Sequence, residues 1–350
     1  MKRLLFFVTL IFPCWVYGQA PTAAQTLRLA RATYEQGRLH EIPSQLNDSL
    51  LLDMNQKQDK VEAYKILCLS YIYLEEPAKA DQSMLNILET DPYFEINEAV
   101  DPAEFVALYK TFRTRPIYRI GAKIGLNATQ PNVTGSVSAV QLNQDSEYKY
   151  GLGFFFGGVA EFPLNDKMTV HGEFLFIQKN FKMNLIVDRE TDELGNPQTN
   201  QFEGTESQNW ISLPVTFEYR VMQKKINPYV ATGLSVDLLL KDELTGERTR
   251  TNASSITETT FEFKPLRENI NISAIAAIGV KLKLAGGYIV SELRYIYGIT
   301  KLNSERTAFA NQEATWEQGY ADPIFKLSSL CVTGSYIHNI FKPKKQTGKK

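Results

Sequence analysis

From Pro116 to Phe341 apolar and polar side chains alternate with a period of two, in segments that are long for β-strands. Eight such segments are predicted strands: 117–128, 150–162, 167–182, 208–221, 228–240, 270–284, 288–301 and 325–341. Soluble strands typically have about 5–6 residues, whereas a tilted strand needs about 9–11 or more to cross a bilayer. The alternation therefore predicts a sheet of long antiparallel strands and constrains the fold more than any other feature.

The connections between these strands alternate in length. Short turns are predicted at 163–166, 222–227 and 285–287, and long polar loops at 129–149, 183–207, 241–269 and 302–324. An even number of meandering strands with this arrangement is typical of an outer-membrane β-barrel, with short turns in the periplasm and long loops outside. Both ends of the barrel are then expected on the periplasmic side.

Alternation alone does not say which face of each strand lies inside. A soluble eight-stranded barrel would turn its apolar face inward. Two features of the strands favour the reverse. Aromatic residues lie near strand ends on the apolar face, where an interfacial girdle is expected (Tyr118, Phe162, Tyr219 and Tyr336), and glycines are common on the polar face. The export signal described below is a third. We therefore expect a transmembrane barrel with lipid on the apolar face.

The face predicted to line the lumen carries charges of both signs. Eight strands enclose just enough space for side chains, so these charges should pair with one another and plug the interior. The predicted network comprises Arg119, Lys123, Glu161, His171, Glu173, Lys179, Glu218, Arg220, Asp237, Lys281, Lys283, Glu292 and Arg294.

The first 18 residues are typical of an export signal. Lys2 and Arg3 precede an apolar run over 4–12, and Val16 and Gly18 supply the small residues at a peptidase site. We predict cleavage after Gly18 and delivery to the cell outer membrane. A lipoprotein signal at Cys14 is the alternative, although a proline rather than a small residue precedes that cysteine.

Residues 19–115 have a helical period and form a predicted periplasmic module. The segment 64–92 resembles one tetratricopeptide repeat, and 26–55 resembles a weaker copy, so the likeness extends over about 22–112. The matching positions are Leu67, Cys68, Tyr71, Ala80 and Pro92. The resemblance implies a scaffold that binds a protein partner, with Tyr34, Tyr64, Tyr71 and Tyr73 as aromatic candidates. Because stacked repeats normally need three or more units, a packed helical pair without a groove is an equal alternative.

Four stretches of the barrel region resemble the PorT-type outer-membrane β-barrel family of Bacteroidetes. They are Asn209-Trp-Ile-Ser-Leu-Pro-Val-Thr-Phe-Glu-Tyr219, residues 227–236, residues 277–283 and Glu292-Leu-Arg-Tyr-Ile-Tyr-Gly298. The resemblance covers about 117–341 and implies an eight-stranded barrel. It also implies a link to type IX protein secretion, but the added helical module departs from the family.

The sequence offers few candidates for chemistry. With 38 basic and 39 acidic residues it lacks the positive field of a nucleic-acid binder, and three cysteines do not make a disulfide scaffold. No catalytic, cofactor or metal-binding motif is present. His171 lies on the lumen face beside Glu173, which makes an acid–base pair conceivable. The acidic stretch 188–193 and the basic tail 342–350 are interpreted as solvated.

Together these features predict an α + β protein of two domains. Residues 1–18 are the signal peptide, 19–115 the helical module, 116–341 the barrel and 342–350 the tail. The leading hypothesis is a non-enzymatic barrel whose module binds an unknown periplasmic protein. Other expected partners are outer-membrane lipid and the barrel-assembly machinery, with Phe341 as a non-terminal assembly signal; nucleic acid is not expected. The alternatives are a barrel enzyme acting on lipid or peptide and an accessory of type IX secretion.

Overall fold

The computed structural model describes residues 22–135, 146–189, 198–222, 225–250, 256–284 and 286–346. The predicted signal peptide lies outside these ranges, as does most of the acidic stretch 188–193. The chain divides into two compact units. One comprises Met1–Thr114 together with Lys342–Lys350, and the other is Arg115–Phe341. The basic tail therefore belongs to the helical unit, although its residues follow the last strand of the barrel.

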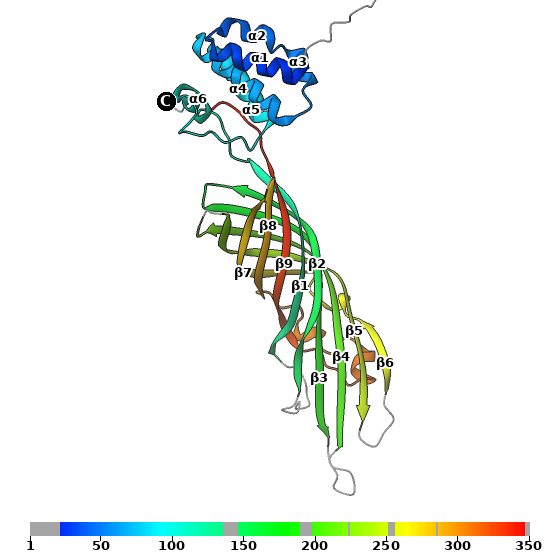
Figure 1. Cartoon of the computed structure of the whole chain (residues 1–350). Coiled ribbons are helices and arrows are strands. Elements are labelled where there is room, and N and C mark those ends of the chain that lie inside the picture. Colours follow the sequence, from blue (N-terminus) through cyan, green and yellow to red (C-terminus); the bar gives the residue numbers. More distant parts are fainter. Residues whose placement is uncertain are drawn as a thin grey trace, which may run out of the picture. The chain divides into compact units, whose positions relative to one another are not determined.

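The helical unit is built from hairpins of short helices (Figure 1). Its elements are α1 (Ala23–Glu35), η1 (Leu39–Glu41), α2 (Ile42–Gln45), α3 (Asp48–Asp53), α4 (Lys57–Tyr73), α5 (Pro77–Thr90) and α6 (Ala103–Lys110). Thr22 and Gln25 form a capping box at the start of α1, and Pro77 opens α5 at a position that needs no backbone N–H. Between α1 and α4 the chain forms three short helical segments, η1, α2 and α3, because the helical turns end at Leu46 before α3 begins.

Two apolar clusters hold the helical unit together. Leu27, Ile42 and Leu67 are buried where α1 and α2 meet α4. Cys68, Met84 and Phe105 belong to a second cluster, in which α4, α5 and α6 meet. None of the helices in the described part of the chain combines the length and the apolar character that a membrane-crossing helix requires.

The second unit is a closed antiparallel barrel of eight strands (Figure 1). A ninth strand, β6, pairs only with the distal part of β5. The strands are β1 (Tyr118–Gly135), β2 (Glu147–Pro163), β3 (Met168–Arg189), β4 (Gln198–Arg220), β5 (Ile226–Arg250), β6 (Ile256–Glu262), β7 (Ile270–Leu284), β8 (Gly287–Gly298) and β9 (Ile324–Ile340). The barrel closes where β1 pairs with β9, from Tyr118 opposite Ile340 to Gly135 opposite Ile324. Closure leaves no unpaired edge within the barrel wall, which is the condition for a sheet to sit in lipid.

Several strands continue well beyond the predicted ends. β3, β4 and β5 extend past the other strands at the end where the long connections lie (Figure 1). Much of the expected loops 183–207 and 241–269 is therefore strand. The sequence pattern does not reveal these extensions, because their outward side chains are polar.

Strand polarity inverts along the barrel. Near the short turns, β4 exposes Val215 and buries Glu218, whereas further along it exposes Glu203 and buries Phe202. The first arrangement suits hydrocarbon outside and the second suits water outside. The inversion therefore marks the edge of the apolar band on the side of the long connections.

A β-bulge on β5 lies at this edge. Asn209 of β4 pairs with Lys241, and the next residue, Trp210, pairs with Leu239, so Leu240 is the extra residue. As a result Leu240 and Lys241 are both exposed, while the residues on either side of them are buried. A bulge of this kind re-aims the following side chains, which here turns Asp242 into the interior.

Candidate functional site

The barrel interior contains layers of ion pairs, and the first lies nearest the short turns. Glu161 accepts from Arg119 at 3.0 Å and from Lys281 at 2.7 Å. Lys281 also contacts Glu218 at 2.6 Å, and Arg220 lies 3.2 Å from the same carboxylate. All five side chains are buried. Removing either carboxylate would leave buried cations with fewer counterions than the layer now provides.

His171 belongs to this first layer. Its Nε2 lies 2.8 Å from Glu218 and 3.7 Å from Glu161. The pairing of His171 with Glu173 that the sequence suggested is therefore not formed, because the two residues contact different partners. His171, Glu161 and Glu218 place possible metal ligands within 4.8 Å of one another, but the ammonium group of Lys281 contacts both carboxylates and supplies the positive charge there.

The second layer is centred on Glu173. Arg294 donates to its two oxygens at 2.7 and 2.9 Å, and Lys123 lies 2.6 Å away. Glu292 contacts Arg294 at 2.8 Å and accepts a hydrogen bond from the Tyr229 hydroxyl at 2.7 Å. Two carboxylates thus balance two cations, with bidentate geometry at the Arg294–Glu173 pair.

A third layer lies one step further from the short turns. Lys179 Nζ lies 3.5 Å from Asp237 and 5.1 Å from the centre of the Trp210 ring. Ser212 donates to Asp237, and Asn271 donates to the same carboxylate at 3.4 Å. Lys179 and Asp237 therefore contact neutral neighbours as well as each other.

One member of the predicted network lies elsewhere. Lys283 is exposed, on the last turn-side residues of β7. The inward face of β7 ends at Lys281, because the strand there reaches the rim of the barrel and its side chains no longer alternate between lumen and lipid. The other twelve predicted residues are buried.

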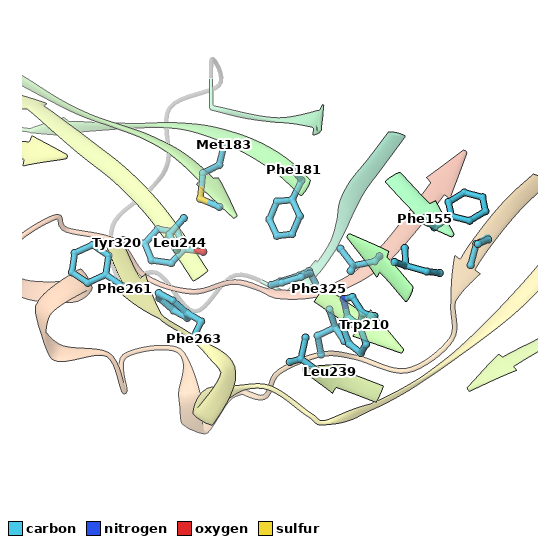
Figure 2. Packing of buried hydrophobic residues seen from close by; sticks show 14 of the residues in the cluster. Phe155, Phe181, Met183, Trp210, Leu239, Leu244, Phe261, Phe263, Tyr320 and Phe325 are labelled. Carbon is cyan, nitrogen blue, oxygen red and sulfur yellow. The ribbon is translucent and has the colours of Figure 1, made fainter. Parts of the chain in front are cut away.

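An apolar and aromatic cluster fills the interior beyond the ion pairs (Figure 2). Phe155 lies at one end of the labelled cluster and Phe263 and Tyr320 lie at the other, with Trp210 and Phe325 between them. Phe181 and Phe325 meet edge to face with ring centres 5.6 Å apart. Aromatic side chains from different strands therefore pack against one another at this level.

A charged cluster that the sequence analysis did not identify is embedded in this aromatic region. Arg267, from the connection before β7, donates to Glu206 at 2.8 Å, to Asp242 at 2.7 Å and to Asp322. Asp322 lies in the connection between β8 and β9, and Asn303 of the same connection donates to it at 2.7 Å. One guanidinium therefore ties two connections to β4 and β5.

Three carboxyl groups face a single cation in this cluster, which we call the Arg267 cluster. Burial raises the pKa of Glu206 well above its usual range and raises the pKa of Asp242. At this level the outward side chains, Lys241 and Glu243, are polar and ion-paired. The cluster thus lies outside the apolar band.

The five positions whose sequence resembles a tetratricopeptide repeat lie on the α4–α5 hairpin or directly after it. Leu67, Cys68 and Ala80 are buried, and the Cys68 thiol donates to the Ala80 carbonyl oxygen at 3.5 Å across the α4–α5 hairpin. Tyr71 is half-buried on α4, and Pro92 directly follows Asp91, the C-cap residue of α5. Burial raises the pKa of the Cys68 thiol to about 12, so this cysteine has a packing role.

Comparison with known proteins identifies the barrel. The family model of the outer membrane protein beta-barrel domain matches residues 115–304. The chain belongs to this family. Membership places the protein in the outer membrane, in agreement with the outward apolar band.

Solved structures with similarity to the chain include small outer-membrane barrels. Neisserial surface protein A is 11% identical and covers 64% of this chain and 97% of its own, with a TM-score of 0.30. The attachment invasion locus protein Ail of Yersinia pestis is 12% identical and covers 63% and 98%, with a TM-score of 0.26. The outer membrane protein AlkL is 11% identical and covers 65% and 92%, with a TM-score of 0.30. A search of curated proteins found no match.

Proposed function

We propose that this protein is a non-enzymatic outer-membrane anchor that holds a helical, partner-binding module in the periplasm. The observation that carries the proposal is the filled interior of the barrel. Buried ion pairs occupy the half nearer the short turns, and packed aromatic side chains occupy the other half. A barrel filled in this way has no open path, so its role is to anchor and present other parts of the chain.

The lengths of the connections between strands support an assignment of the helical unit to one side of the membrane. Three short connections, including the turn between Pro163 and Met168, lie at the end where β1 begins and β9 ends. Short turns are periplasmic in barrels of this kind. The helical unit is joined to the barrel at Thr114 and at Phe341, both at this end, so we place it in the periplasm and the long connections outside.

A conductance measurement tests whether the barrel interior is sealed. Purified protein in planar bilayers should show no steady conductance steps under salt conditions in which an open porin shows them. Glu173→Ala should remain closed as well, because the aromatic cluster is a second barrier that does not depend on this residue. Steady nanosiemens steps from the unaltered protein would overturn the sealed interior.

A deletion tests the role of the module. Removing residues 20–115 while keeping the export signal should leave a barrel that inserts in the outer membrane but loses its specific periplasmic cross-links in cells. A barrel that inserts and retains every cross-link would overturn the partner-binding role. Heat-modifiable migration in gels confirms that the truncated barrel is folded.

A further inference from the structure

The helical unit contains a groove with an acidic rim. It has a volume of about 370 Å³ and lies between the α4–α5 hairpin and α6. Its apolar floor includes Tyr71, Ala80 and Leu108, and three acidic residues lie along it: Glu75, Asp81 and Glu104. The groove thus offers an apolar surface next to negative charge.

The chain's own C-terminal tail lies against this groove. The backbone N–H of Arg113 donates to the Lys344 carbonyl at 3.0 Å, and the N–H of Gln346 donates to the Thr111 carbonyl at 2.8 Å. Phe112 and Lys345 form an antiparallel bridge between these two hydrogen bonds. Residues 344–346 of the tail are therefore held as an extended segment, in the manner of β-augmentation.

One lysine of the tail reaches the acidic rim. Lys345 Nζ lies 2.5 Å from Asp81 Oδ2, and Lys345 itself lines the groove. Main-chain hydrogen bonds and the Lys345 ammonium group hold the tail, together with the Arg113 guanidinium, which donates to the Lys342 carbonyl oxygen at 2.8 Å. Any extended peptide with a suitably placed lysine can form the same contacts.

Net charge favours a basic occupant. Residues 19–114 carry nine Lys and Arg against fifteen Asp and Glu, and the tail 342–350 carries five Lys and no acidic residue. The Lys345–Asp81 pair is partly exposed, with 47% and 28% of the two side chains accessible, so water and salt weaken it. The tail is thus complementary in charge to the groove, and its ion pair with Asp81 is weakened by solvent.

We propose that the groove recognises an extended, lysine-bearing segment of a protein partner, and that the C-terminal tail occupies it as an intramolecular competitor. This inference rests on the proposed function, for which it names the binding site and the chemistry of the partner. A tethered tail has a high effective concentration, so a partner needs either a higher affinity or more than one contact to displace it. A small apolar side chain of the partner would cover the floor at Tyr71, Ala80 and Leu108.

A peptide of the tail sequence tests the proposal directly. The probe is a fluorescently labelled peptide of residues 341–350, and binding is measured by anisotropy to protein in detergent micelles at low salt. The protein truncated after Phe341 should bind this peptide at least ~10-fold more tightly than the full chain, because its groove is vacant. A peptide with its lysines replaced by glutamate should not bind.

Charge reversals at three acidic residues test the groove, and one of them is the matched control. In the truncated protein, Asp81→Lys should weaken peptide binding by roughly fivefold or more, since a surface attraction becomes a repulsion. Glu104→Lys, on the facing helix α6, should weaken it as well. Glu89→Lys makes the same change of charge on α5 at a residue outside the groove and should leave binding unchanged.

Equal peptide binding by full-length and truncated protein would overturn the competitor role. Equal binding by Asp81→Lys and Glu89→Lys would overturn the groove as the site. Either failure leaves the proposed function intact if deletion of 20–115 still abolishes cross-links. If instead the peptide results hold and the cross-links survive that deletion, the groove stands and the proposed function fails.

Discussion

Replacement of Glu173 is the most informative change within the barrel. Glu173→Gln keeps the size of the side chain but removes the negative charge that Lys123 and Arg294 share. Glu292 then remains as the carboxylate next to both cations. We expect a large loss of stability without a change of fold, because the neighbouring strands keep all their backbone hydrogen bonds.

The contact distances set the scale of this loss. At an effective dielectric constant of about 20, a unit pair 2.6–2.7 Å apart attracts by roughly 6 kcal/mol. The substitution also removes the desolvation cost of the carboxylate, which offsets part of that attraction. Breaking a buried pair by removing one partner costs about 3–5 kcal/mol, and we expect Glu173→Gln to fall in this range.

Urea unfolding in lipid vesicles measures the effect, followed by the fluorescence of the buried Trp210 in proteins whose exposed Trp316 is replaced by phenylalanine. Glu203→Gln is the matched control, because Glu203 is exposed beyond the apolar band and should change stability by no more than about 0.5 kcal/mol. Adding Lys123→Met to Glu173→Gln should recover part of the loss, since it removes a cation without a partner. A loss below about 1 kcal/mol, the scale of one neutral hydrogen bond, would refute the buried-network account.

Three further predictions concern other parts of the molecule. Burial raises the pKa of Glu206 and of Asp242, so these two groups bind protons more tightly in the folded protein than in the unfolded chain. Their contribution to folding stability is therefore complete below pH ~4, the usual carboxyl pKa, and is lost as the pH rises through their pKa values in the folded protein. Protease cleavage within 301–323 should therefore increase with pH in the wild type and depend less on pH in Glu206→Gln, and an identical profile in both would refute this. Gly125→Val should destabilise the barrel by about 1–3 kcal/mol in vesicle unfolding, because a Cβ at Gly125 would lie 2.4 Å from the Phe155 ring; unchanged stability would contradict that packing. The Cys68 thiol, with its pKa raised by burial to about 12, should resist thiol reagents at pH 8 until the helical unit unfolds, and rapid labelling of folded protein would contradict its burial.

The sequence predicted the barrel well because a transmembrane strand has a strict period. Ile120 and Val215 repeat on one face and Arg119 and Glu218 on the other, so a single pattern gives both strand and orientation. The same reasoning failed beyond the apolar band. There the outward residues, such as Glu203, are polar, and a polar stretch was interpreted as loop although Phe202 and Leu244 kept the alternation on the inner face.

The sequence predicted which residues lie inside the barrel but not which residues they contact there. The alternation of side chains placed His171 and Glu173 on the inner face. Because the two residues are two positions apart on one strand, they contact different neighbours, and only the register of the closed barrel determines which neighbours these are. Arg267 was missed because it lies in a connection, where no period signals burial. The docking of Lys345 on the helical unit was missed for a similar reason, since a run of lysines at a chain end is usually solvated.

The most direct test of the account is the depth of two tryptophans in a bilayer. Trp210 is 0% exposed inside the barrel, whereas Val215 on the same strand is 58% exposed on the outward face. Lipids with brominated acyl chains quench tryptophans that touch hydrocarbon, so two single-tryptophan proteins are compared, one with Trp210 alone and one with Val215→Trp alone. We predict strong quenching for Val215→Trp and little for Trp210. Strong quenching of Trp210 with none at position 215 would contradict the assignment of the apolar face to lipid.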